Sequence, residues 1–369
     1  MFDVKAHLKK LVEAHAPSGH EAPLAAILRA EWEGLVDSFE QDKLGSLIGI
    51  KRATVPPADH ARADGSARRI MLAAHMDEIG MMVRDVVDGF VYVHRISGVD
   101  NRVMLAQNVI VHGRRPISGV VTSKPVHLLP TAQRNRYPTF DELMVDVGLT
   151  PEEASALIRV GDLITVDAPM IDLGGTKVAG KAMDDRACVA AITACLHELQ
   201  RLQHGWDVYA AATVQEETGL LGATTAANLI QPDIAIALDV CFAPQPGVDG
   251  DSTCEMGGGP GIGVGPNFHI KLYDKIRDTA KRAEIKLQDD FIPGASGTDA
   301  WAIQVSQTGV PTALMEVPIR NMHSAVETAD IRDIERLGRV MALFIADLTP
   351  DFLATIDWED LKAAEEKAM

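Results

Sequence analysis

The chain has 369 residues, of which 47% are hydrophobic and 24% are charged, and its formal net charge is −17 at pH 7. This composition is typical of a folded globular protein, and the length favours two domains. The negative charge argues against a nucleic-acid partner, because phosphate binding requires clustered Lys and Arg. The apolar runs are all shorter than the roughly 18 residues of a membrane span, so we expect no membrane partner.

The N-terminal segment predicts helices rather than a signal peptide. Apolar residues between positions 2 and 15 recur mostly at spacings of three and four, and a second helix is expected over residues 21–34. Because the continuous apolar core of a signal peptide is missing, we expect a cytoplasmic protein. The four cysteines form no CxxC pair, so we expect reduced thiols, with Cys188 and Cys195 in the core.

Strands follow these helices. Two short ones are expected at residues 36–42 and 46–52, and a polar loop covers residues 52–68. The next strand, over residues 68–75, ends in His75. From residue 78 to 176 short strands and turns predict a small β-rich domain, whereas from residue 177 onward strands alternate with longer helical stretches, as in an α/β fold.

Five side chains that can bind metal ions stand at the edges of these apolar, strand-like runs. Ligands at the rim of a buried sheet can build a site for two divalent metal ions. Such a site needs a carboxylate that bridges both ions, terminal ligands for each, and an open position for water. The five candidates are His75, Asp184, Glu217, Asp239 and His323. Because they lie on both sides of residues 78–176, we predict that residues 1–77 and 177–369 form one discontinuous domain and that 78–176 are an insertion.

Individual roles follow from the neighbours of these residues. Asp184 lies at a strand-to-helix turn, where both oxygens can face a crevice, so it is the candidate bridge. Glu216 and Glu217 are adjacent at a strand end and point in different directions, so Glu217 can bind metal while Glu216 acts as general base. Asp77, two residues after His75, can accept the second imidazole N–H and fix the tautomer. We therefore predict Glu216 and Asp77 as the catalytic residues of a hydrolase.

Each feature also has an ordinary structural interpretation. Glu216 and Glu217 are typical of a solvated turn, Asp184 can cap a helix, and His323 can be a hydrogen-bonded loop histidine. Their joint occurrence at strand ends favours the metal site. The glycine-rich run at residues 255–267 lacks the lysine of a phosphate-binding loop, so we expect a turn-rich wall of the active site there.

The same residues stand in segments that closely resemble the tetrahedral aminopeptidase and glutamyl aminopeptidase family of dinuclear metallopeptidases, once also labelled endoglucanases. The resemblance runs nearly end to end and includes APSGHE, AAHMDEIG, KAMDDRAC, QEETGLLGA, GTDA and GVPTALMEVPIRNMHSAVET. One departure is the segment Arg320-Asn321-Met322-His323, where the family usually has Arg-Tyr-x-His. Another is the loop at residues 52–68, which is longer and more polar than the simplest family version.

The resemblance implies a phosphorylase-like α/β peptidase domain with a mixed central sheet, and an inserted β-barrel-like domain that makes dimer contacts within a dodecameric shell. It implies two divalent metal ions per subunit, for which zinc, cobalt and manganese are all suitable. It also implies a cis peptide bond after Asp184. The implied roles are His75 and Asp239 on one metal ion, Glu217 and His323 on the other, Asp184 as the bridge and Glu216 as the base.

Together these features predict an aminopeptidase that removes N-terminal residues from short peptides. One alternative is an amidohydrolase of the same fold that acts on an acylated amino acid or a modified dipeptide. Another is a non-catalytic binding or scaffold protein, which should have lost ligands that this chain retains. Glycoside hydrolysis is disfavoured, because it uses two carboxylates that flank a sugar rather than a set of metal ligands.

Overall fold

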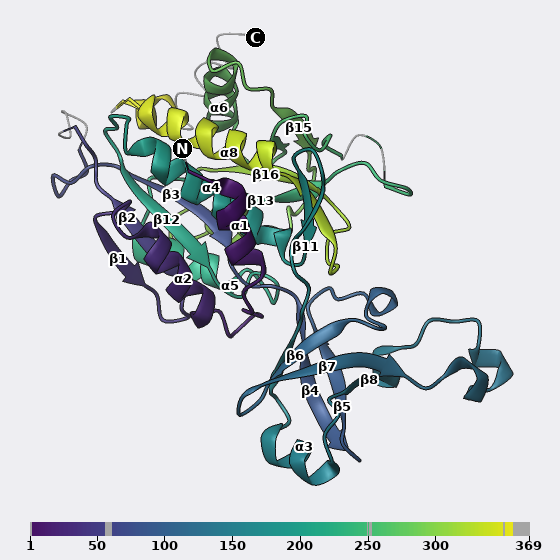
Figure 1. Ribbon diagram of the computed structural model, residues 1–369. Coiled ribbons are helices and arrows are strands. Elements are labelled where there is room, and N and C mark those ends of the chain that lie inside the picture. Colours follow the sequence, from purple (N-terminus) through teal and green to yellow (C-terminus); the bar gives the residue numbers. More distant parts are fainter. Residues whose placement is uncertain (1, 56–60, 249, 251–252, 350, 357–369) are drawn as a thin grey trace.

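The computed structural model describes residues 2–55, 61–248, 250, 253–349 and 351–356. Its main body is an α/β domain around a large mixed sheet, and a closed six-stranded barrel projects from one end of that body (Figure 1). The predicted α/β fold with a mixed central sheet and a barrel-like domain is therefore confirmed. Among the helices of the described residues, none combines the length and the apolar character needed to cross a bilayer.

The large sheet places its parallel strands at the centre. The four central strands β12, β3, β13 and β16 are parallel, and β11 runs in the same direction because two antiparallel pairings separate it from β16. Their carboxyl ends therefore meet at one edge. In spatial order the strands are β1 (Ser38–Gln41), β2 (Leu47–Lys51), β12 (Asp207–Thr213), β3 (Arg69–His75), β13 (Ile234–Phe242), β16 (Thr312–Arg320), β17 (Glu327–Asp330), β11 (Lys177–Gly180) and β10 (Ile171–Gly174), with β14 (Gly261–Val264) beside β16 and β15 (Gln288–Phe291) beside β14.

Helices cover both faces of this sheet. Alternate residues of β3 enter two separate cores, with Leu72 in one and Ala73 in the other, and this is why the strand reads as a continuous apolar run. The larger core contains α1 (Val4–Val12), α2 (Ala22–Trp32), α4 (Met183–Leu199), α6 (Ile270–Arg282) and α8 (Ile331–Ala346). The smaller core contains α5 (Leu221–Ile230) and α7 (Asp299–Ile303).

The N-terminal elements lie where the sequence predicts them, with shorter bounds for both helices. Asp3 caps α1 by accepting a hydrogen bond from the Ala6 N–H, and Pro23 stands in the first turn of α2. Cys188 and Cys195 are both buried in the core, as expected. Of the polar loop at 52–68, residues 56–60 lie outside the described residues.

The barrel closes in the order β4-β5-β8-β7-β6-β9 around a core of valine, isoleucine, leucine and methionine side chains. The helix α3 and the strand β8 were not predicted. The predicted limits of the insertion, 78–176, enclose the whole barrel but also β10, which pairs with β11 in the large sheet. The barrel elements are β4 (Gly80–Val87), β5 (Phe90–Ile96), β6 (Asn108–His112), β7 (Pro116–Ser123), β8 (Leu143–Asp146), α3 (Pro151–Leu157) and β9 (Leu163–Val166), and short 3-10 turns occur at Asn101–Val103, Val126–Leu128, Thr131–Gln133, Phe140–Glu142 and, outside the barrel, Phe352–Thr355.

Candidate metal centre

The predicted ligands converge at the edge where the central strands end. His75 is the last residue of β3, Asp239 lies near the end of β13, and Glu217 follows β12. Asp184 lies in the first turn of α4, just after β11, and His323 follows β16. Strand ends that are far apart in the sequence are neighbours at this edge, so the fold assembles a ligand set that no single segment contains.

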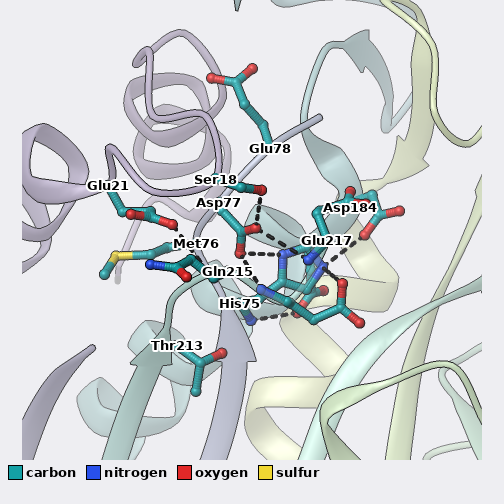
Figure 2. A network of polar contacts seen from close by, with 12 residues as sticks. Ser18, Glu21, His75, Met76, Asp77, Glu78, Asp184, Thr213, Gln215 and Glu217 are labelled. Carbon is teal, nitrogen blue, oxygen red and sulfur yellow. Dashed lines mark hydrogen bonds and ion pairs between the residues drawn. The ribbon is translucent and has the colours of Figure 1, made fainter. Parts of the chain in front are cut away.

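Asp184 lies between the two imidazoles. Its Oδ1 is 3.0 Å from Nε2 of His75, and its Oδ2 is 3.2 Å from Nε2 of His323 (Figure 2 shows Asp184 beside His75). Nε2 of His323 is also 3.7 Å from Oε1 of Glu217. One carboxylate oxygen therefore faces each histidine, which is the arrangement that a bridging ligand requires.

Donor atoms from the cluster form two groups, each within 4.8 Å, that share His75. One group adds Asp184 and Glu217, and the other adds Glu216 and Asp239. Glu216 thus lies on the Asp239 side of the cluster, with its Oε2 3.9 Å from Nε2 of His75, whereas Glu217 lies on the His323 side. The two neighbouring glutamates do point in different directions.

The cluster carries an excess of buried negative charge. Asp184, Glu216 and Asp239 are each less than a tenth exposed. Burial raises the pKa of Glu216 to about 10 and that of Glu217 to about 7, and it also raises the pKa of Asp239 well above its usual value. Grouped buried carboxylates are costly unless cations or protons neutralise them. Carboxylate oxygens and imidazole nitrogens are suitable ligands for divalent zinc, cobalt or manganese, so the residues present fit two such ions.

Asp77 supports the turn that carries the two glutamates. Its oxygens accept hydrogen bonds from the backbone N–H groups of Glu216 and Glu217 at 3.1 and 3.2 Å, and from the Ser18 hydroxyl at 2.6 Å (Figure 2). The imidazole contact is longer, because Nδ1 of His75 lies 3.4 Å from Asp77 Oδ1 and is without a hydrogen bond among the described residues. Asp77 is therefore placed to orient the turn as well as the ring.

Two further carboxylates hold the backbone of the ligands. Glu327 accepts hydrogen bonds from the N–H groups of Asp184 at 3.1 Å and His323 at 2.7 Å, and Asp185 accepts one from the His75 N–H at 3.2 Å. The peptide bond between Asp184 and Asp185 is cis, as the resemblance implies. Sequence reasoning missed Glu327, although an acidic residue four positions after a candidate ligand is a usable signal.

The barrel also reaches the cluster. The Ser97 hydroxyl donates a hydrogen bond of 2.6 Å to Oε2 of Glu217. At the next position, a Cβ on Gly98 would lie 2.3 Å from Nδ1 of His323, so only glycine fits there without displacing that ring. Neither residue was predicted, because both follow a barrel strand rather than a strand of the large sheet.

The cluster opens into a cavity of about 570 Å³, within the usual range of small-molecule sites. The candidate ligands and Glu216 line one part of it. Residues 290–298, Phe242, Glu316 and Met322 line much of the rest. The departure from the resembling family lies at the preceding residue, Asn321, and Met322 beside it is in a position to contact a bound substrate.

Comparisons with known proteins agree over most of the chain. Residues 60–340 match the sequence profile of the M42 glutamyl aminopeptidase family. Over 93% of its length the chain is 36% identical to the lysyl aminopeptidase of Pyrococcus furiosus, of which it covers 97%. It superposes on the TET aminopeptidase of the marine sediment archaeon Thaumarchaeota archaeon SCGC AB-539-E09 with a TM-score of 0.88 and 31% identity, over 96% of this chain and 99% of that one.

A further similar structure is the TET1 peptidase of Pyrococcus horikoshii, with a TM-score of 0.81 and 28% identity over 94% of this chain and 100% of that one. That peptidase can assemble into a tetrahedron or a large octahedral shell, and PhTET1-12s, equally similar, is a dodecamer. The family profile and the 36% identical relative both span most of the chain. The chain therefore belongs to the M42 glutamyl aminopeptidase family and is a peptide hydrolase.

Proposed function

We propose that the chain is an aminopeptidase that removes N-terminal residues from short peptides with the help of two divalent metal ions. The observation that carries this proposal is the position of Asp184, with one oxygen facing His75 and the other facing His323 at the edge of an open cavity. The aminopeptidase names of the family and of its relatives support the same reaction.

In this proposal Asp184 would contribute to holding both ions. His75 and Asp239 would hold one of them, and Glu217 and His323 would hold the other. When bound, the two ions would lower the pKa of a water molecule and polarise the scissile carbonyl. Zinc, cobalt and manganese all suit these donors, so metal availability would decide which is used.

Glu216 is proposed as the general base. Its backbone N–H is held by Asp77, and its carboxyl lies 3.9 Å from Nε2 of His75. Glu216 can accept the proton of the attacking water and then deliver it to the leaving amine. Asp77 acts through Glu216 and His75, as a positioning residue.

The Glu216→Gln variant tests the base. The amide has the same shape but accepts no proton, so kcat should fall by about 10²- to 10⁴-fold. Metal content, measured by plasma mass spectrometry, should stay at the wild-type value. The exposed Glu152→Gln should leave both quantities unchanged. Near-normal turnover in a Glu216→Gln protein with its full metal content would show that another group is the base.

A substrate panel tests the reaction. The protein is first loaded with zinc, cobalt or manganese. Each aminoacyl substrate is then tested in two forms, one with a free and one with an acetylated amino group. An aminopeptidase should cleave only the free-amine set, and only with metal. Cleavage of the acetylated set would instead favour the amidohydrolase alternative. The names of the family and of the Pyrococcus furiosus relative refer to different N-terminal residues, glutamyl and lysyl, so membership alone does not define the preferred residue.

The proposal includes self-association. Homologues form large shells. The barrel exposes Val126, Leu128 and Tyr137, each more than half accessible, and two of them, Val126 and Tyr137, line a surface groove of about 520 Å³. Exposed apolar side chains of this size mark contact surfaces. We propose dimers through this barrel surface and a dodecamer built from them. Light scattering of the wild-type protein should then give the mass of a dodecamer, and Tyr137→Asp should lower the measured mass. A wild-type protein with the mass of a monomer would contradict the proposal.

A further inference from the structure

Two carboxyls in the wall of the cavity have no role in the proposed metal site. Asp290 in β15 and Glu316 in β16 both line the cavity, and they are 8% and 2% exposed. Each carboxyl influences the pKa of the other, so the two groups lie close together. Oε2 of Glu316 is buried and has no hydrogen-bond partner among the described residues. Two buried acids with an unpaired oxygen are costly, so this part of the cavity lacks a positively charged partner.

This acidic pair lies close to the proposed metal ligands. Glu316 is the direct neighbour of Asp239 in the pairing of β13 with β16, and paired strands lie about 4.8 Å apart. Gly261 of β14 stands opposite Glu316, and a Cβ there would lie 3.1 Å from Oε2 of Glu316. Because β14 has a glycine at this position, none of its side chains occupies the space next to the Glu316 carboxyl.

The rest of the lining is suited to an alkyl chain that ends in a charge. Phe242 and Phe291 line the same cavity and are about half exposed. None of the described residues that line this cavity is Lys or Arg. The proposed metal ions would balance Asp184, Glu217 and Asp239, but nothing in the lining balances the acidic pair. The missing positive charge can then come from the substrate.

We propose that Asp290 and Glu316 form the part of the cavity that binds the side chain of the N-terminal residue and that they select lysine and arginine. This inference rests on the proposed aminopeptidase function. A peptide whose scissile carbonyl lies at the metal centre presents its first side chain beside Asp239, within reach of Glu316. An ammonium or guanidinium group donates hydrogen bonds to the two carboxylates, and the phenylalanines pack against its stem. A glutamate at the same position adds a third carboxylate and is repelled.

The first test measures kcat/KM for lysyl, arginyl, leucyl and glutamyl p-nitroanilides with the metal-loaded protein. Lysyl and arginyl substrates should exceed leucyl by about 10- to 100-fold, the range for a charge-assisted hydrogen bond. Glu316→Gln and Asp290→Asn should remove most of this preference, because the amide keeps the size of the carboxyl but not its charge. The matched control is Asp289→Asn, since Asp289 is not among the lining residues and pairs with Tyr273 and Arg277.

The second test measures binding by calorimetry with L-lysine and L-norleucine, which share the stem and the α-amino group but differ in the terminal ammonium. Wild type should bind lysine more tightly, and Glu316→Gln should remove the difference. If Glu316→Gln weakened the binding of lysine and norleucine equally, the acidic pair would bind the α-ammonium, and the proposal would be overturned. Preferred cleavage of leucyl or glutamyl substrates would overturn it while leaving the aminopeptidase function intact. A retained lysine preference without cleavage of any substrate would support the pocket and reject the aminopeptidase function.

Discussion

At the scale of single residues, Ser97 links the barrel to the metal centre. Its hydroxyl donates a 2.6 Å hydrogen bond to Glu217, whose pKa burial raises to about 7. A donor at this distance favours the ionised carboxylate, the form that binds metal. Removal of a partner behind a metal ligand weakens metal affinity by about 10- to 100-fold. We expect Ser97→Ala to lower metal affinity within that range, as measured by competition with a chelator.

The control for this prediction is Ser118→Ala, because Ser118 is an exposed serine on β7 of the same barrel. It should keep wild-type metal affinity, and both variants should keep wild-type thermal stability. If Ser97→Ala and Ser118→Ala had the same metal affinity, the hydrogen bond from Ser97 to Glu217 would not support the ligand.

The residues that sequence reasoning identified share one property: each candidate ligand stands near the end of a strand of the large sheet or just after it. That rule is physical, because parallel strands end together at one edge. It does not apply to Ser97, which comes from the barrel, or to Glu316, which lies in the middle of β16, and Asp290 belongs to β15, outside the main path of the sheet. Their proximity to the cluster depends on how β14, β15 and the barrel pack, and sequence separation carries no information on that packing. The catalytic and ligand roles themselves stay predictions.

At the scale of elements, α4 and α8 pack unusually closely. A Cβ on Gly338 of α8 would lie 2.6 Å from the carbonyl oxygen of Ala191 and 2.7 Å from the Cβ of Ala194, both in α4. Real Cβ contacts are longer, so Gly338→Ala must push the helices apart. The cost of such overpacking, about 1–3 kcal/mol, should exceed the gain of about 1 kcal/mol in helix propensity. We expect a lower free energy of unfolding, measured in urea.

Arg339→Ala provides the control, since the exposed Arg339 is the next residue of α8. Its effect should stay within about 0.5 kcal/mol, as for most surface substitutions. If Gly338→Ala were as stable as wild type or more so, the close approach of α4 and α8 would not limit the packing of this core.

Elements with a strong apolar pattern were predicted, whereas the short elements β8 and α3 were not. The strand β8 has four residues, too few for an alternation to show, and it is stabilised by β5 and β7, which lie far from it in the sequence. The helix α3 did carry a signal, because Thr150 and Glu153 form a capping box with Pro151 between them. The glycine-rich run at 255–267 was expected to be a turn-rich wall, but it contains the buried strand β14.

At the scale of the whole molecule, one buried ionic cluster joins three parts of the chain. Glu78 lies between β3 and the barrel, Lys181 precedes α4, and Arg186 lies in α4. Glu78 accepts hydrogen bonds from Lys181 at 2.7 and 2.9 Å and from Arg186 at 3.1 Å, and also from the Ala16 N–H of the N-terminal segment. The entry into the barrel is thereby tied to the helix that begins at the metal centre. The sequence shows that each member of this cluster is a charged residue, but it does not show that the residue is buried.

This cluster predicts a specific loss of stability in acid. Lys181 and Arg186 outweigh the effect of burial and lower the pKa of Glu78 from 4.5 to about 2. A carboxyl whose pKa is lowered in the folded state stabilises the protein above its unfolded pKa, and that contribution disappears as the pH falls from about 4.5 to about 2. The full contribution is about 3 kcal/mol, of which about 2 kcal/mol should be lost by pH 3.

Urea unfolding at pH 6 and pH 3 checks this prediction in wild type and in Glu78→Gln. The variant should be less stable at pH 6, because removing one partner leaves buried charges uncompensated, but it should lose about 2 kcal/mol less than wild type between the two pH values. All other carboxyls titrate in both proteins, so the difference between the two losses isolates Glu78. The exposed Glu335→Gln should follow wild type. If wild type and Glu78→Gln lost the same free energy of unfolding between pH 6 and pH 3, the acid sensitivity of the fold would arise from other residues.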